Sequence, residues 1–166
     1  GINLTPKQLR GVKSLLFVAC GTAHQAGMLA KYLLEPLIRI PIPVEIASEF
    51  RYSKQFWNKD TALLVISQSG ETADTLAALR EAKHRGIMTL GMVNVPGSTI
   101  AQETDAGIFT HAGKEVGVAS TKAFTAQITV LLMMAIALGE RKELDVLTKS
   151  RILKAFRLIP DQIRTI

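Results

Sequence analysis

Short runs of consecutive apolar residues alternate along this chain with longer segments in which apolar residues recur every three to four positions. The clearest pair is Thr61–Ile66, which is apolar after its first residue, and Ala73–Arg85, where Leu76, Leu79 and Ala82 have helical spacing. The first pattern predicts a strand that is buried on both faces, and the second predicts an amphipathic helix. The chain therefore combines strands and helices.

The same two patterns predict the remaining elements. Five strands are expected, at Ser14–Cys20, Val44–Ala47, Thr61–Ile66, Ile87–Val93 and Ala106–Thr110. Long helices are expected at Gly21–Ile38, Ala73–Arg85, Ser120–Leu138 and 144–159, with a short helix within Ser48–Asp60 and another capped by Ser98. In the last long helix, we expect one apolar face made of Leu144, Leu147, Leu153 and Phe156.

Strands that alternate with helices form a parallel sheet covered on both faces. We therefore predict a single α/β domain over residues 1–166, with a three-layer, doubly wound, five-stranded parallel sheet in the flavodoxin-like order 2-1-3-4-5. The switch point of this order lies between strands 1 and 3, where ligands bind outside the carboxyl ends of the strands. Two turns would meet there, Cys20-Gly21-Thr22 and Ser67–Thr72.

Polar groups that could bind a ligand are concentrated in the turn Ser67-Gln68-Ser69-Gly70-Glu71-Thr72. Three hydroxyls, an amide and unpaired backbone N–H groups converge at the start of a helix, which suits a phosphate. The alternative is plain capping, for which one hydroxyl suffices. Glu71 opposes a phosphate unless its carboxylate points away. No Gly-Lys-Ser/Thr follows, so the turn is not a nucleoside-triphosphate P-loop.

Composition limits the class of partner. The 166 residues are 48% hydrophobic, as expected for one globular domain with a real core. The net charge is +6, but residues 61–140 hold five Lys/Arg against seven Asp/Glu, whereas residues 141–166 hold seven against three. We interpret the positive excess at the chain end as a solvated basic face of the terminal helix, and we expect no nucleic-acid partner.

Other residue types suggest no cofactor and no metal. Cys20 is the only cysteine, which excludes an internal disulfide and favours a reducing, cytoplasmic location. It ends a strand, so we expect it to pack rather than act as a nucleophile. His24 and His111 have no partner at metal-ligand or triad spacing. The longest apolar run, Ile128–Leu138, is too short to cross a bilayer, and we see no signal peptide.

Three segments in this order carry a resemblance to a known family: Cys20-Gly21-Thr22, the hexapeptide at 67–72, and Gly117-Val118-Ala119-Ser120-Thr121-Lys122-Ala123-Phe124. Together they closely resemble the isomerase half of the glutamine–fructose-6-phosphate aminotransferase (glucosamine-6-phosphate synthase) family. The resemblance covers about residues 14–139. It implies the sugar isomerase (SIS) fold, a five-stranded parallel sheet between helices.

The resemblance also implies roles for individual residues. It assigns the sugar phosphate to Ser67, Gln68, Ser69 and Thr72, with Thr22 lining the crevice, and it assigns contacts with the sugar chain to Val118 and Ser120. Lys122 is only a weak candidate, because a lysine early in a long helix commonly faces solvent. The chain departs from the family at Ala23, where a serine commonly follows Cys-Gly-Thr; one hydroxyl is lost there.

As the resemblance implies, the whole enzyme hydrolyses glutamine in an N-terminal domain and transfers the ammonia to fructose 6-phosphate, giving glucosamine 6-phosphate. Its acid–base residues belong to a second SIS domain, so we assign no catalytic residue to this chain. The chain begins at Gly1 and ends just past an expected helix. We therefore expect the first SIS domain of a longer chain, without its glutaminase and second SIS domains.

Two alternatives remain from the sequence: a stand-alone phosphosugar isomerase, which would need its own base, and a non-catalytic phosphosugar sensor.

The helix expected at Ser120–Leu138 is more apolar than a helix on the outer surface of one small domain needs to be. We therefore expect it to lie in a domain or subunit interface of a homodimer.

Overall fold

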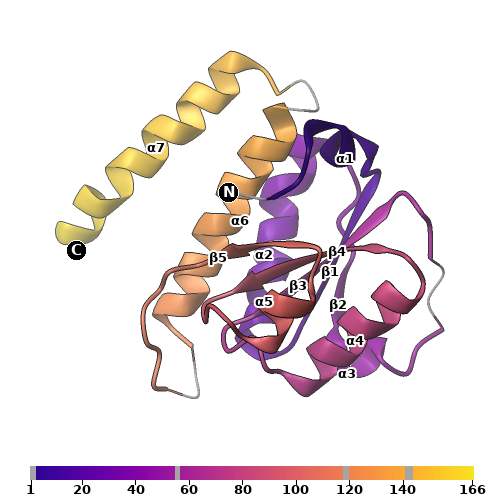
Figure 1. The fold of residues 1–166 in the computed structure, drawn as a ribbon. Coiled ribbons are helices and arrows are strands. Elements are labelled where there is room, and N and C mark those ends of the chain that lie inside the picture. The colour runs from indigo at the N-terminus through magenta and orange to yellow at the C-terminus, as the bar shows by residue number, and fades with distance from the viewer. Residues whose placement is uncertain (1–2, 55–56, 118–119, 141–143) are drawn as a thin grey trace.

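A five-stranded parallel sheet forms the centre of the protein (Figure 1). The computed structural model describes residues 3–54, 57–117, 120–140 and 144–166. Within the sheet, the strands follow the order β2-β1-β3-β4-β5, and the predicted order is therefore confirmed. The strands are β1 (Ser14–Ala19), β2 (Val44–Ile46), β3 (Thr61–Ser67), β4 (Met88–Val93) and β5 (Ala106–Phe109).

Helices cover both faces of this sheet and complete the three layers (Figure 1). One layer contains α2 (Gly21–Ile38) and α6 (Lys122–Glu140), which pack against each other. The other layer contains α3 (Ala47–Phe50), α4 (Ala73–His84) and α5 (Thr99–Glu103). Two further helices, α1 (Pro6–Gly11) and α7 (Val146–Arg164), lie at the two ends of the chain.

The apolar runs of the strands are explained by the two separate cores that they fill. Side chains alternate along a strand, so Leu15 and Phe17 of β1 point into the core beneath α2 and α6. Leu16 and Val18 point into the core beneath α3, α4 and α5. Because both faces of the strand are covered, every residue from Leu15 to Ala19 is buried.

The predicted boundaries agree with the structure to within a few residues, with two exceptions. Helix α1 lies in a segment for which no element was predicted. Helix α7 begins at Val146, where Asp145 accepts a hydrogen bond from the backbone N–H of Thr148, and it continues past Pro160 to Arg164. It is therefore longer than the predicted 144–159.

The apolar face predicted for this last helix was wrong. Leu144 precedes α7, and Leu147 and Leu153 are 63% and 39% exposed. At 3.6 residues per turn, two positions six residues apart differ by roughly 120° around a helix, so these two leucines do not share a face. The residues of α7 that are partly buried are Thr148, Lys149, Ile152 and Phe156.

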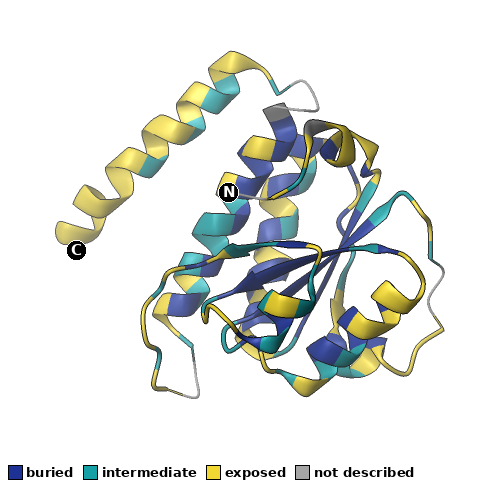
Figure 2. Ribbon diagram, viewed as in Figure 1, coloured by how far each residue is buried: buried dark blue, intermediate teal, exposed yellow. Residues whose placement is uncertain are grey.

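The two long C-terminal helices differ in how they are packed. Helix α6 lies against α2 and contributes buried residues such as Leu131 and Ala135 to the core. In the described part of the chain, α6 is the one helix that is long enough and apolar enough to cross a membrane. Buried core helices can have the same length and composition. Helix α7 has no buried residue and runs largely exposed, apart from the sheet (Figure 2).

Candidate functional site

The two hydroxyl-bearing turns lie at neighbouring positions on one edge of the sheet. Strands β1 and β3 pair in parallel, with Ala19 opposite Ile66, so the turns that follow them begin side by side. They border a cavity of about 340 Å³. Small-molecule sites commonly occupy about 300–1,000 Å³. Twelve residues line the cavity: Cys20, Gly21, Thr22, Ala23, Ile66, Ser67, Gln68, Ser69, Thr72, Glu115, Gly117 and Ser120.

Six of the seven predicted site residues are thus brought together around one cavity. Ser67 is buried, Gln68, Ser69, Thr72 and Ser120 are partly buried, and Thr22 is exposed at the rim. Val118 lies outside the described residues. Ala23, the position at which the expected serine is missing, is a buried part of the lining.

The turn after β3 is organised by hydrogen bonds from its own backbone. The Ser67 hydroxyl accepts the N–H of Gly70 at 3.0 Å, and the Ser69 hydroxyl accepts the N–H of Glu71 at 3.1 Å. Ser67 and Thr72 share a further hydrogen bond between their hydroxyl oxygens, 2.9 Å long. These bonds hold all three hydroxyls within a single turn.

Gly70 allows this turn to lie close to α5. Its φ of +70° belongs to the left-handed region, and a Cβ atom placed there would stand 2.1 Å from the Oγ atom of Ser98. Only glycine avoids both the backbone strain and the overlap.

The two helices that begin at the cavity are not capped by side chains. Thr72 at the start of α4 and Cys20 at the start of α2 both have N-cap geometry, and neither side chain makes a capping hydrogen bond. In both helices, the first backbone N–H groups and the positive end of the helix dipole lie next to the cavity. This arrangement favours an anion and argues against the alternative that the hydroxyls only cap a helix.

The carboxylate of Glu71, which would repel such an anion, is turned toward α5. It accepts the backbone N–H of Thr99, the first residue of α5, at 2.8 Å. This backbone hydrogen bond is the main reason that the pKa of Glu71 lies below its ordinary value of 4.5. Ser98 has N-cap geometry, but its side chain makes no capping hydrogen bond, so Glu71 supplies the cap.

A third segment, which leads into α6, completes the lining with Glu115, Gly117 and Ser120. The Oε2 atom of Glu115 accepts the backbone N–H of Ala123 at 2.9 Å and the hydroxyl of Ser120 at 3.1 Å. The Ala123 N–H, followed by Ser120, lowers the pKa of Glu115 below 4.5 despite an opposing effect of desolvation. Glu115 is not recognisable as a site residue from the sequence, because only the folded loop brings it back to the start of α6.

Asn94, at the end of β4, connects this third segment to the turn after β3. Its backbone N–H donates to the carbonyl of Gln68 at 3.2 Å. Its side-chain oxygen accepts the N–H of Ala112 at 2.8 Å, and its amide donates to the carbonyl of Gly113 at 2.7 Å. The backbone and the side chain of this one residue therefore hold the two segments in a fixed relation.

The residues that the sequence analysis set aside lie away from the cavity, except for Cys20. Cys20 is partly buried, packs against the core beneath α3 and α4, and contributes to the lining. His24 does not line the cavity, and His111 and Lys122 border a different groove beside α6. Among the described residues, no group of three or more His, Cys, Asp or Glu is placed to hold a metal ion.

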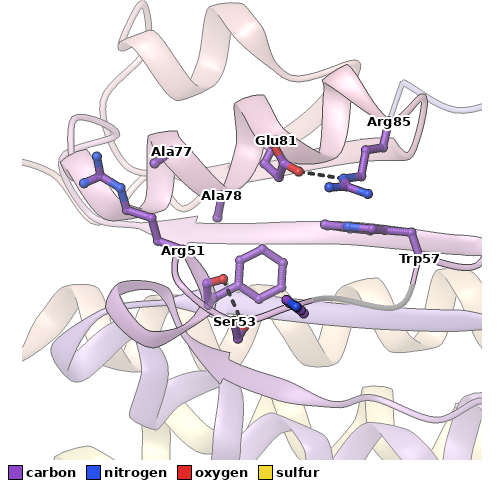
Figure 3. Close-up of a pocket in the computed structure, with 9 residues that line it drawn as sticks. Arg51, Ser53, Trp57, Ala77, Ala78, Glu81 and Arg85 are labelled. Atoms are coloured by element: carbon purple, nitrogen blue, oxygen red, sulfur yellow. Dashed lines mark hydrogen bonds and ion pairs between the residues drawn. The ribbon is translucent and has the colours of Figure 1, made fainter.

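A second cavity, of about 510 Å³, lies between α4 and the segment after α3 (Figure 3). Arg85 at one end donates to Glu81 at 2.6 Å, and Arg51 at the opposite end donates to Asp74 at 3.4 Å. Two of its cationic side chains are therefore already paired with carboxylates. The predicted site residues are not part of its lining.

Comparisons of the sequence match the chain to one family of domains and to several named relatives. The sequence profile of the SIS domain matches residues 8–137. The chain is similar to the glutamine–fructose-6-phosphate aminotransferase (isomerizing) of Chlorobaculum tepidum, with 49% identity over 163 residues that make up 98% of this chain and 26% of that protein. The protein of the same name from Escherichia coli K12 is 46% identical over 156 residues, which are 93% of this chain and 26% of that protein.

A solved structure is also similar. It is the C-terminal domain of glucosamine-fructose-6-phosphate aminotransferase from Francisella tularensis, with a TM-score of 0.83 and 40% identity over 87% of this chain and 41% of that one. The chain thus spans about a quarter of the length of the two full-length relatives.

Proposed function

The chain belongs to the SIS domain family, and from this premise we propose that it is the phosphosugar-binding first SIS domain of a glutamine–fructose-6-phosphate aminotransferase. In this proposal, the cavity between the turns after β1 and β3 holds the phosphate of fructose 6-phosphate and of the product, glucosamine 6-phosphate. Ser67, Gln68, Ser69 and Thr72 bind the phosphate, Thr22 lines the rim, and Val118 and Ser120 contact the sugar.

One observation supports this proposal above the others: several neutral donors and two uncapped helix starts converge on a single cavity. The backbone N–H group of Glu71 occupies a lone pair of Ser69, so this hydroxyl keeps a hydrogen to donate outward. Ser67, which accepts the N–H of Gly70, shares one hydroxyl hydrogen bond with Thr72, so this pair has one further hydrogen to donate. Phosphate oxygens are acceptors that match such donors. The identity of 40–49% to proteins of this name favours the aminotransferase over a stand-alone isomerase or a sensor.

In the proposed parent enzyme, ammonia released from glutamine condenses with the C2 carbonyl of fructose 6-phosphate to form an imine and water. A proton then moves from C1 to C2 and the proton of the C1 hydroxyl moves to the nitrogen, so that C1 becomes the aldehyde carbon of glucosamine 6-phosphate. The residues of this chain hold the phosphate and orient the sugar, while the missing glutaminase and second SIS domains supply the ammonia and the acid–base groups. This division of labour agrees with the hydroxyl-rich turn after β3, whose one charged side chain, Glu71, is turned toward α5.

We further propose that the parent enzyme is a cytoplasmic homodimer and that the exposed side of α6 contributes to an interface. An apolar groove of about 840 Å³ runs between β5 and α6. Met133 and Phe109 in its lining are 58% and 38% exposed. Contact with a partner would remove this apolar surface from water.

Replacement of Ser69 by alanine tests the phosphate site directly. A hydrogen bond to a charged group contributes roughly 1.5–3 kcal/mol, so Ser69→Ala should weaken binding of fructose 6-phosphate about ten- to a hundredfold. Isothermal titration calorimetry on this chain and the Michaelis constant of the parent enzyme are the two measurements. Ser53→Ala, a hydroxyl outside the cavity, is the matched control and should bind normally. An unchanged Michaelis constant in Ser69→Ala would refute the assignment.

A further inference from the structure

The hydroxyl groups around the cavity differ in the direction of their hydrogen bonds. In the turn after β3, the Ser69 oxygen already accepts the N–H of Glu71 at 3.1 Å. The other oxygen near it, that of Ser67, lies 3.5 Å away, which is long for a bond between hydroxyls. The hydrogen of Ser69 is therefore available to an acceptor in the cavity, such as a phosphate oxygen.

Ser120, on the opposite side of the lining, has the reverse polarity. Its hydroxyl oxygen lies 3.1 Å from Oε2 of Glu115. The carboxylate is ionised at neutral pH, because the N–H of Ala123 and the Ser120 hydroxyl lower its pKa below 4.5. An ionised carboxylate has no hydrogen to donate, so the hydrogen of Ser120 must point at Glu115. Only the lone pairs of Ser120 remain for the cavity.

We propose that Glu115 is a positioning residue that fixes Ser120 as a hydrogen-bond acceptor, so that this end of the cavity selects a donor group of the ligand, a sugar hydroxyl or an amino group. This inference rests on the proposed function and deepens it. A phosphate ester is largely dianionic at neutral pH, so it has almost no hydrogen to offer to Ser120. A phosphosugar is thereby bound in one direction, with its phosphate at the turn after β3 and its polar chain toward Ser120.

The position of Glu115 allows this role without a direct contact to the phosphate. The same oxygen that accepts from Ser120 also accepts the N–H of Ala123 in the first turn of α6. The carboxylate is therefore anchored to the helix, and Ser120 is anchored to the carboxylate. Thr121 is a weaker partner, with its hydroxyl oxygen 3.5 Å from Oε1.

The experiment compares two ligands by calorimetry on the 166-residue chain: fructose 6-phosphate, and methyl phosphate, which has the phosphate ester without the sugar hydroxyls. Glu115→Ala and Ser120→Ala should each weaken binding of fructose 6-phosphate about tenfold and leave binding of methyl phosphate unchanged. Ser69→Ala should weaken binding of both ligands. The double variant Glu115→Ala/Ser120→Ala should bind no worse than Ser120→Ala alone, because Glu115 acts through Ser120.

Two conservative variants guard against a general effect on folding. Glu115→Gln keeps an acceptor oxygen of the same reach and should retain affinity within about threefold. Glu115→Asp keeps the charge, but its side chain is one methylene shorter and its oxygens no longer reach Ser120. This variant should therefore behave like Glu115→Ala. Glu103→Ala removes a carboxylate that pairs with Arg80 outside the cavity and controls for the change in net charge.

The outcomes separate the two proposals. If the wild-type chain binds neither ligand, the proposed phosphate site is wrong and this inference fails with it. If the wild type binds fructose 6-phosphate and Glu115→Ala weakens both ligands equally or neither, the phosphate site stands and the role of Glu115 is wrong. Additive losses in the double variant would also overturn it.

Discussion

At the scale of single residues, hydrogen bonds within the protein already occupy some of the donors and acceptors of the candidate site. The groups that remain decide what a ligand can bind. Ser69 accepts a backbone N–H group and keeps its hydrogen for the cavity, whereas Ser120 donates to Glu115 and offers the cavity only lone pairs. Two serine side chains thus acquire opposite roles from their neighbours. Gly70 makes the arrangement possible by allowing the turn to approach Ser98 closely.

Gly70→Ala should destabilise the protein by about 2–4 kcal/mol, since left-handed backbone strain and a steric overlap with Ser98 both oppose the added methyl group. Gly97→Ala is the matched control, because Gly97 also has a positive φ, of +80°, but has open space around its Cβ position. It should cost only about 1–2 kcal/mol. Urea unfolding at equilibrium measures both values, and equal losses would contradict the role given to the close approach.

At the scale of elements, two carboxylates that precede α5 and α6 accept backbone N–H groups in the first turns of these helices. Glu71 accepts the first N–H of α5, and Glu115 accepts an N–H in the first turn of α6. Each carboxylate joins a loop at the cavity to a helix packed on the sheet. The loops around the site are therefore held by the helices that follow them.

These caps predict how stability depends on pH. The folded-state pKa of Glu71 lies below 4.5, so its contribution to stability is present above that pH and is lost as the pH falls through the folded-state pKa. Glu71→Gln should lower the midpoint of thermal unfolding at neutral pH, and the difference from wild type should shrink well below pH 4.5. Differential scanning fluorimetry across this range measures it.

Ser98→Ala is the control for the cap at α5. The Ser98 hydroxyl is buried and has no hydrogen-bond partner among the described residues, so its removal should change stability by less than about 0.5 kcal/mol. A larger loss in Ser98→Ala than in Glu71→Gln would show that the serine is the true cap.

At the scale of the whole molecule, the domain leaves apolar surface uncovered on one side. Met133 and Phe109 in the groove between β5 and α6, and apolar residues of α7 such as Leu147 and Ile163, are exposed to solvent. This surface is consistent with the proposal that further domains or a second subunit pack here.

Met133→Glu should therefore shift the proposed dimer of the parent enzyme toward monomer, because a charge on the exposed side of α6 would be buried in the interface. Light scattering coupled to size-exclusion chromatography measures the mass. Tyr52→Glu is the control, since Tyr52 is 81% exposed and follows α3 on the other side of the sheet. A parent enzyme that keeps its dimeric mass after Met133→Glu would exclude this part of α6 from the interface.

The sequence by itself determined the sheet, its strand order and the meeting of the turns after β1 and β3. Apolar runs buried on two faces specify strands such as β3 with little dependence on context, and parallel strands bring their carboxyl ends to one edge.

Only the tertiary structure decided that Glu71 turns toward Thr99, that Glu115 reaches Ser120 and Ala123, and that Leu147 and Leu153 of α7 face solvent. Each of these depends on loop paths or on a packing partner, which local patterns of polarity do not encode. The physical reason is that burial has a regular period along a strand or helix, whereas a hydrogen bond across a loop depends on where the whole chain places its two ends.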